Sequence, residues 1–157
     1  MTSVATNEKG GEVETAFKDS VAFAAQNDSS VHAHADLSDA LVFFGITGDL
    51  AFKKIFPALQ NMAKRGVLNL PVVGVASSPW TQEQLIQRAR DSITQHGGGV
   101  DEKAFAILAN SISYVQGDYR VADTFNRIRV ALGNAQRPLH YLAIPPSLFG
   151  AVVEGLA

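Results

Sequence analysis

The feature that most constrains this chain is a glycine-containing turn between an apolar run and an amphipathic helix. Gly45, Gly48 and Ala51 follow the apolar run 41–44 with the spacing G-x-x-G-x-x-A. Gly45 permits a sharp turn off a strand end, Gly48 lets backbone approach a diphosphate closely, and Ala51 allows close helix–strand packing. The N-terminus of a helix also favours phosphate through its free N–H groups. The spacing predicts a dinucleotide-binding turn, with a tight turn that binds no ligand as the alternative.

Apolar runs and helical patterns alternate from residue 40 to the end of the chain. Strands are predicted at 41–44, 71–76, 111–115 and 139–144, and helices at 48–65, 81–96, 101–109, 121–132 and from Ser147 onward. Strands that alternate with helices form right-handed parallel crossovers. We therefore expect an α/β fold: a Rossmann-like open parallel sheet with helices on both faces. No closing signal follows the last helix, so the domain is expected to be incomplete at the C-terminus.

Individual residues mark the expected helix boundaries. Thr81 with Gln84 three positions later is typical of a capping box, Gly66 is a stop signal, and Ser147 is expected to cap the last helix. Pro57 conflicts with the helix predicted at 48–65, because proline lacks the N–H donor that a helix interior needs. We expect it to kink or offset that helix.

The first 38 residues differ in composition from the rest, being rich in Ala, Ser, Thr, Asn, Asp and Glu. We expect residues 1–38 to be a flexible N-terminal arm with at most one loosely docked helix at 13–25, and residues 39–157 to be a partial dinucleotide-binding (Rossmann) domain. His32 and His34 are interpreted as solvated side chains, because no further ligands accompany them. No metal site is predicted.

Composition narrows the classes of partner. The net charge of −2 shows no basic excess, so neither nucleic acid nor an anionic membrane is an expected partner. No apolar run is long enough to span a bilayer, and the N-terminus lacks the pattern of a secretory signal. The chain has no cysteine, which excludes a disulfide framework within it and fits a reducing compartment. A cytoplasmic location is expected.

A longer pattern surrounds the glycine turn. Residues 44–59 read F-G-I-T-G-D-L-A-F-K-K-I-F-P-A-L. They resemble the opening motif of the glucose-6-phosphate dehydrogenase family, G-x-[ST]-G-D-L-A-x-x-K-[LI]-x-P-[AS]-L, in which the awkward Pro57 is a regular member. The resemblance continues in order through 73–76, 114–119 and 141–149. Residues 1–38 show no such resemblance.

This resemblance implies a function and a set of residues. The family oxidises glucose 6-phosphate at C1 to 6-phosphogluconolactone in the pentose phosphate pathway and passes a hydride to NADP, or in some members to NAD. The positions that match cofactor-binding residues are Gly45, Thr47, Gly48, Asp49, Leu50, Lys54, Ser77, Ala143 and Pro145. Lys54 matches a lysine that reaches toward both cofactor and substrate, whereas Lys53 is interpreted as solvated.

Two departures from the family qualify this inference. Ser77 stands where the family usually has Arg or Lys to pair with the 2′-phosphate of NADP, and a hydroxyl cannot replace that charge-assisted contact in strength. We therefore expect weaker discrimination in favour of NADP than in the family. The family's catalytic histidine and substrate motif have no counterpart here, and His96 and His140 are not substitutes, so no catalytic residue is predicted in this chain.

Three interpretations follow. The first is the coenzyme-binding part of a glucose-6-phosphate dehydrogenase, inactive by itself, whose full-length form binds glucose 6-phosphate and is a homo-oligomer. The second is a stand-alone dinucleotide-binding or interaction module without catalysis. The third, a short-chain dehydrogenase or epimerase, is disfavoured because the chain has no Tyr-x-x-x-Lys pair. An open sheet edge also predicts self-association of the chain.

Overall fold

The computed structural model describes residues 3–6 and 37–157, which form one parallel sheet with helices packed on it. The strands are β1 (Ser3–Thr6), β2 (Ala40–Phe44), β3 (Val72–Ala76), β4 (Ile112–Gln116) and β5 (Pro138–Leu142). The helices are η2 (Ala51–Ile55), α2 (Phe56–Lys64), α3 (Gln82–His96), α4 (Glu102–Ser111), α5 (Ala122–Leu132), η3 (Pro146–Leu148) and α6 (Phe149–Leu156). Within these residues, no helix combines the length and apolar character that a membrane crossing requires.

The strand order is β1-β5-β2-β3-β4, and every neighbouring pair is parallel. The four strands after β1 have the order 3-2-1-4 when they are numbered along the chain, which is that of the first half of a doubly wound sheet. The predicted Rossmann-like α/β fold is therefore confirmed.

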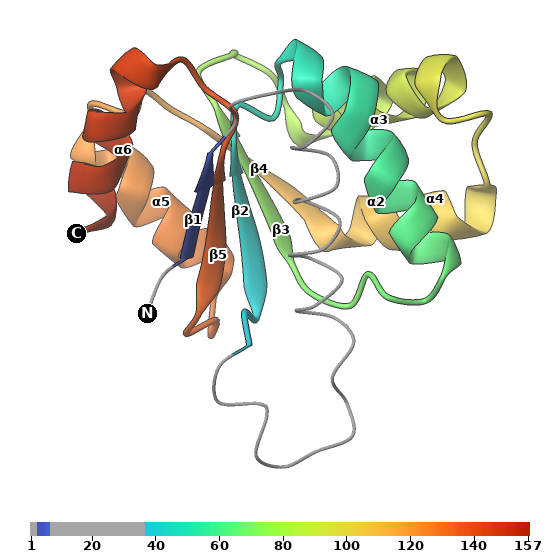
Figure 1. The fold of residues 1–157 in the computed structure, drawn as a ribbon, viewed down its shortest axis with the longest axis horizontal. Coiled ribbons are helices and arrows are strands. Elements are labelled where there is room, and N and C mark those ends of the chain that lie inside the picture. Colours follow the sequence, from blue (N-terminus) through green and yellow to red (C-terminus); the bar gives the residue numbers. More distant parts are fainter. Residues whose placement is uncertain (1–2, 7–36) are drawn as a thin grey trace.

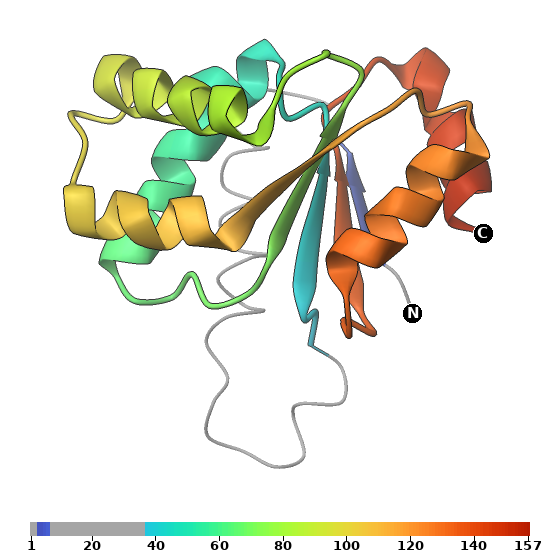
Figure 2. The ribbon, with the colours of Figure 1, turned by 180° about the vertical axis from the view of Figure 1, so that it is seen from behind.

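Helices cover both faces of the sheet, as predicted. Helices α2, α3 and α4 lie on one side, and α5 and α6 lie on the other (Figures 1 and 2). Residues alternate along a strand, so Leu41 and Phe43 join the core on the α2–α4 side, whereas Val42 and Phe44 join the core on the α5–α6 side. Strand β2 is buried along its whole length because it has strands on both edges and helices on both faces.

The helix predicted at 48–65 contains a π-helical segment, η2, directly before α2. The Phe56 amide binds the carbonyl of Ala51, five residues back, and Pro57 lies in the first turn of α2. An α-helix would require an N–H donor at position 57, and the wider π turn shifts the pairing where that donor is missing. The predicted offset at Pro57 therefore takes the form of a π bulge.

Two of the three predicted boundary signals are confirmed. Thr81 and Gln84 form a reciprocal capping box, with the Thr81 Oγ1 accepting from the Gln84 amide at 3.2 Å. Gly66 has a φ of +71°, and its amide binds the Ala63 carbonyl while the next amide binds Met62, which together close a Schellman motif. The predicted cap at Ser147 is wrong: this residue lies within η3, and α6 begins two residues later without a side-chain cap.

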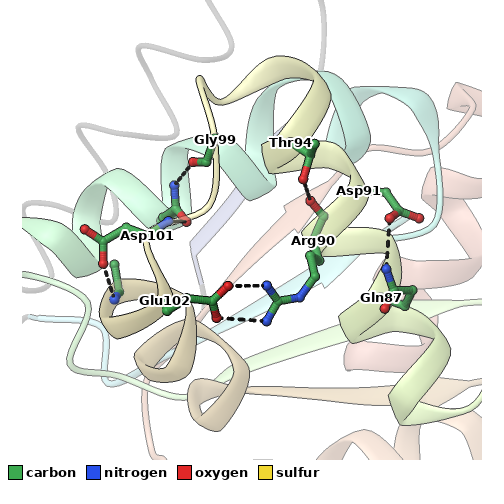
Figure 3. Close-up of polar contacts among 9 residues, drawn as sticks. Gln87, Arg90, Asp91, Thr94, Gly99, Asp101 and Glu102 are labelled. Atoms are coloured by element: carbon green, nitrogen blue, oxygen red, sulfur yellow. Dashed lines mark hydrogen bonds and ion pairs between the residues drawn. The ribbon is translucent and has the colours of Figure 1, made fainter.

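A polar network joins α3 to α4 across the glycine-rich connection. The Arg90 guanidinium binds both carboxylate oxygens of Glu102, at 2.7 and 3.2 Å (Figure 3). The buried Gln60 side chain donates to the Gly99 carbonyl and accepts from the Asp101 amide. Helix α4 is thereby fixed against both α2 and α3, which sets the course of the chain into β4.

Four residues of the predicted N-terminal arm form strand β1, which pairs in parallel with β5. The outer edge of β5 would otherwise present unpaired backbone groups, which an extended segment satisfies. The helix predicted at 13–25 and the residues His32 and His34 lie outside the described residues.

Candidate dinucleotide-binding site

Three loops meet at the carboxyl edge of the sheet: those that follow β2, β3 and β5. Strands β2, β3 and β5 are adjacent and parallel, so their carboxyl ends are brought together. In doubly wound sheets, ligands bind outside the carboxyl ends of the strands, where the strand order reverses. Here the reversal occurs at β2, from which β3 lies on one side and β5 on the other.

Gly45 is the residue through which the loops after β2 and β5 come into contact. It has a φ of +89°, and its amide donates to the Val75 carbonyl at 2.7 Å. A Cβ at this position would lie 2.2 Å from the Ala143 carbonyl oxygen. Glycine is therefore required at position 45 for two reasons. The sharp turn needs a positive φ, as the sequence predicted, and the backbone of the loop after β5 comes too close to leave room for a side chain.

Gly48 begins the helical turn that faces outward from the sheet edge. Its amide binds the Gly45 carbonyl at 3.0 Å, and its own carbonyl accepts from Phe52 at 3.2 Å. The amides of Asp49, Leu50 and Ala51 precede this helical hydrogen bond, and the first N–H groups of a helix have no partner within it. Gly48 and Asp49 are exposed. This arrangement is suited to an anion such as a diphosphate.

The loop after β3 lies against the glycine turn through two hydroxyl groups. Thr47 Oγ1 and Ser78 Oγ are 2.8 Å apart. Ser77 precedes Ser78 and is exposed, beside the residue that contacts the turn. Position 77 therefore carries an exposed neutral hydroxyl, next in sequence to the residue that contacts the turn.

Two tyrosines, for which the sequence suggested no role, hydrogen-bond to the end of β3 and to the loop that follows it. The Tyr119 hydroxyl donates to the Val75 carbonyl at 3.2 Å, and the Tyr114 hydroxyl donates to the Ser78 carbonyl at 2.5 Å. Burial raises the pKa of Tyr119 to about 12 and also raises the pKa of Tyr114. Both phenols therefore remain protonated donors at neutral pH. The five-residue spacing between Tyr114 and Tyr119 does not indicate that both hydroxyls bond to carbonyls near the end of β3.

Gly74 is a further residue whose role the sequence did not reveal. It lies inside β3, and a Cβ there would approach the Ile46 side chain to 2.8 Å. Ile46 itself is fully buried in the core on the α2–α4 side. The missing side chain of Gly74 thus leaves room for the residue that anchors the glycine turn, and a glycine inside a strand can mark such close approach.

The remaining predicted site residues fall into two groups. Ala143 donates its amide to the Phe44 carbonyl at 3.0 Å, and Pro145 is exposed two residues beyond it, at the same edge as Gly45. Lys54 is exposed in the π segment, one turn into the helix, as is Lys53. Leu50 is partly buried and packs against the core on the α2–α4 side.

The two histidines within the described residues, His96 and His140, are not in the loops at this edge. His140 is within β5 and is 3% exposed, and His96 is the last residue of α3. His140 contributes to the face covered by α5 and α6, where its ring lies 6.1 Å from that of Phe44. Neither histidine is among the residues that form the three loops.

The sheet order together with the glycine turn defines the class: a dinucleotide-binding domain of the doubly wound type. A sequence model described as "Glucose-6-phosphate dehydrogenase, NAD binding domain" matches residues 42–157. This chain belongs to the glucose-6-phosphate dehydrogenase family, and the match covers its coenzyme-binding domain.

Relatives and solved structures agree with this membership. The chain is 42% identical over 120 residues to "Glucose-6-phosphate 1-dehydrogenase 1" of Mycobacterium tuberculosis, which covers 76% of this chain and 26% of the relative. The crystal structure of glucose-6-phosphate 1-dehydrogenase from Mycobacterium avium superimposes with a TM-score of 0.72 at 44% identity, over 76% of this chain and 26% of that one. A glucose-6-phosphate dehydrogenase solved in complex with glucose 6-phosphate superimposes with a TM-score of 0.66 at 27% identity, over 76% and 27%. The chain therefore spans about a quarter of the length of these relatives.

Proposed function

We propose that this chain is the NADP- or NAD-binding part of an oxidoreductase that oxidises glucose 6-phosphate to 6-phosphogluconolactone. The observation that carries the proposal is the glycine turn at the switch point of a sheet that belongs to this family. The substrate is inferred from the relative whose structure was solved with glucose 6-phosphate. Since the chain spans about a quarter of its relatives, we expect it to have no dehydrogenase activity by itself.

The cofactor diphosphate is proposed to lie over Gly45 and Gly48, next to the amides of Asp49 and Leu50. The absent Cβ of Gly48 leaves the backbone accessible, and the start of the helix offers N–H donors. When bound, the cofactor supplies the acceptor for the hydride from C1 of the sugar. Ala143 and Pro145 are proposed to contact its nicotinamide half, because they follow β5 on the far side of Gly45 from β3.

The adenosine half is proposed to lie beside Ser77, on the β3 side of the turn. The exposed hydroxyl of Ser77 and the Thr47–Ser78 pair are the polar groups there, and no cation occupies position 77. A hydroxyl can hydrogen-bond a 2′-phosphate or a free 2′-hydroxyl, but it adds no charge to either contact. We therefore infer weak discrimination between NADP and NAD.

Calorimetric titration with NADP and with NAD tests the cofactor site. We expect both to bind, with dissociation constants within about tenfold of each other, and Ser77→Arg to tighten NADP about tenfold through a charge-assisted contact while leaving NAD unchanged. Gln87→Arg, on the exposed surface of α3, adds the same charge elsewhere and controls for net charge. Equal NADP affinities for the wild type and Ser77→Arg would contradict the role of position 77. No binding of either cofactor at millimolar concentration would contradict a preformed site.

Lys54 is proposed to reach the cofactor and the substrate. The adjacent Lys53 lies in the same π segment and is also exposed, so it is a matched control. We expect Lys54→Ala to weaken NADP binding at least fivefold and Lys53→Ala to change it less than twofold. Equal effects of the two substitutions would indicate that both act only through net charge.

A cytoplasmic location is also proposed. A relative from Arabidopsis thaliana, 30% identical over 146 residues, is named "Glucose-6-phosphate 1-dehydrogenase 6, cytoplasmic".

A further inference from the structure

One face of α3 contacts Phe52, the second residue of the π segment η2. The guanidinium carbon of Arg88 lies 4.0 Å from the centre of the Phe52 ring, and the His96 ring meets it nearly perpendicularly, with centroids 5.4 Å apart. Between these two, the Ser92 hydroxyl donates a hydrogen bond to the Phe52 carbonyl. The three α3 residues are spaced four apart, so they lie on one face of the helix. Phe52 is therefore held through both its ring and its backbone.

The Phe52 carbonyl needs a donor from outside its own helix. In an α-helix the donor would be the amide of Phe56, but that amide binds the Ala51 carbonyl instead. In a π-helix the donor would be the amide of residue 57, which is a proline and has no N–H. The hydroxyl of Ser92 supplies the hydrogen bond that neither pairing provides.

Ser92 differs from the other two hydroxyl residues of α3 and α4. Thr94 donates to the Arg90 carbonyl and Ser111 to the Ile107 carbonyl, each four residues back in its own helix. Serine and threonine commonly form this local bond. Ser92 is fully buried, and its hydroxyl crosses to another segment. Since a buried hydroxyl and a buried carbonyl each destabilise a fold when unpaired, this bond stabilises the junction of α3 with η2.

The π segment joins the glycine turn to the lysine for which we propose a role in cofactor binding. The Phe52 amide binds the Gly48 carbonyl at 3.2 Å, and Lys54 follows two residues later in the same segment. Successive helical residues point about 100° apart around the helix axis. A shift of the pairing by one residue within this segment would therefore redirect the Lys54 side chain. A bond that holds the Phe52 carbonyl favours the pairing that is present.

We propose that Ser92 is a positioning residue for Lys54: it fixes the π pairing that directs Lys54 toward the cofactor, while Arg88 and His96 hold the Phe52 ring. The inference rests on the proposed function, because Lys54 acts on the cofactor only there. Ser92 is fully buried, so it does not contact the cofactor itself. Its whole effect on binding must then pass through Lys54.

A double-mutant cycle on NADP binding tests this dependence. Calorimetry compares the wild type, Ser92→Ala, Lys54→Ala and the double variant. We expect Ser92→Ala to weaken NADP binding about threefold when Lys54 is present, and by less than about 1.5-fold when Lys54 is replaced, because residues that act through one another are not additive. A role of Ser92 in general stability alone would weaken binding by the same factor in both backgrounds.

Amide hydrogen exchange in the chain without cofactor tests the hold on the segment separately. Without the Ser92 hydroxyl, the Phe52 carbonyl competes with the Ala51 carbonyl for the Phe56 amide. The Phe56 amide should then exchange about tenfold faster, because the π pairing opens more often. Ser111→Ala is the matched control: it removes a hydroxyl-to-carbonyl bond from α4 and should change neither this exchange rate nor the NADP affinity.

A second variant removes the ring contacts and keeps the backbone bond. Phe52→Leu retains the carbonyl that Ser92 binds, and it loses the ring that Arg88 and His96 contact. It should weaken NADP binding about twofold, again only when Lys54 is present. If Ser92→Ala does not fold, the same cycle with Phe52→Leu decides the question.

The proposal is overturned if Ser92→Ala weakens NADP binding equally with and without Lys54. It is also overturned if the exchange rate of the Phe56 amide does not change in Ser92→Ala. Failure of the wild type to bind either NADP or NAD would count against the proposed cofactor site and not against the contact between α3 and η2. The exchange of the Phe56 amide, measured without cofactor, still decides whether Ser92 holds the segment.

Discussion

The two faces of the sheet differ in the extent of the apolar clusters buried against them. On the side of α2, α3 and α4, a large cluster of buried apolar residues runs in sequence from Leu41 to Tyr141 and includes Leu59 and Leu85, which are fully buried. On the side of α5 and α6, the buried cluster is smaller, and a cavity of about 410 Å³ lies between these helices and the start of β5. The cavity lining includes Phe125, Ile128, Leu132, His140, Gly155 and Leu156. A cavity of about 360 Å³ lies on the other side, between α2 and α4.

The α5–α6 side also contains a buried polar group. The Nδ1 atom of His140 is buried and has no hydrogen-bond partner within the described residues. Such an atom destabilises a fold by its lost hydration. Each side of the sheet has such an atom, because Arg88 Nε on α3 is also buried without a hydrogen-bond partner in the part of the chain that the structure describes. The comparison teaches that the two sides differ in the extent of their buried apolar clusters, and that the smaller cluster contains a buried imidazole. The glycine turn lies at the carboxyl edge of the sheet, after β2, between these two sides.

The largest loss of stability is expected for a substitution in the glycine turn, at Gly45. Gly45→Ala should lower the free energy of unfolding by at least about 4 kcal/mol, because the new Cβ would meet the Ala143 carbonyl at 2.2 Å at a positive φ. Gly66→Ala also has a positive φ, but nothing lies within 4 Å, so it should cost about 1 kcal/mol. Urea unfolding of the two variants measures the difference. Equal losses would show that backbone conformation alone matters and that contact between the loops does not.

The second prediction compares the two faces directly. Leu59→Ala, in the closed cluster, should destabilise the chain by about 3 kcal/mol, within the usual range for fully buried leucines. Leu132→Ala, at the partly exposed cavity lining, should cost only about 1 kcal/mol, because fewer contacts are lost there. Thermal and urea unfolding give both values. Similar losses at the two positions would break the comparison.

The third prediction uses pH to examine the buried imidazole on the α5–α6 side. Burial lowers the pKa of His140 from 6.5 to about 4. The unfolded chain therefore takes up a proton first as the pH falls, so stability is complete above pH 6.5 and declines between about pH 6.5 and 4, by at most about 3 kcal/mol. His140→Phe should remove this decline and leave other acid effects in place. The exposed His96→Gln serves as a control that should retain it. An unchanged pH profile in His140→Phe would indicate that the ring is protonated without cost in the folded chain.

Local signals in the sequence predicted most elements because their causes are local. The capping box at Thr81, the stop at Gly66 and the apolar runs act within a few residues of themselves. The cap at Ser147 failed because Pro146 begins a 3-10 turn, and α6 starts only after it. The glycine turn was located correctly between strand and helix, but the spacing alone did not separate a binding turn from an empty one.

The sequence by itself determined the order of strands and helices, the position of the glycine turn and the family, because periodicity, turn residues and motif order are written along the chain. Only the tertiary structure decided that Gly45 must admit the Ala143 carbonyl, that Tyr119 supports the end of β3, and that Ser3–Thr6 pairs with β5. Each of these depends on which distant segments become neighbours in the sheet. These contacts join residues 44 to 136 positions apart, so they follow from strand order and packing, and no local pattern encodes them.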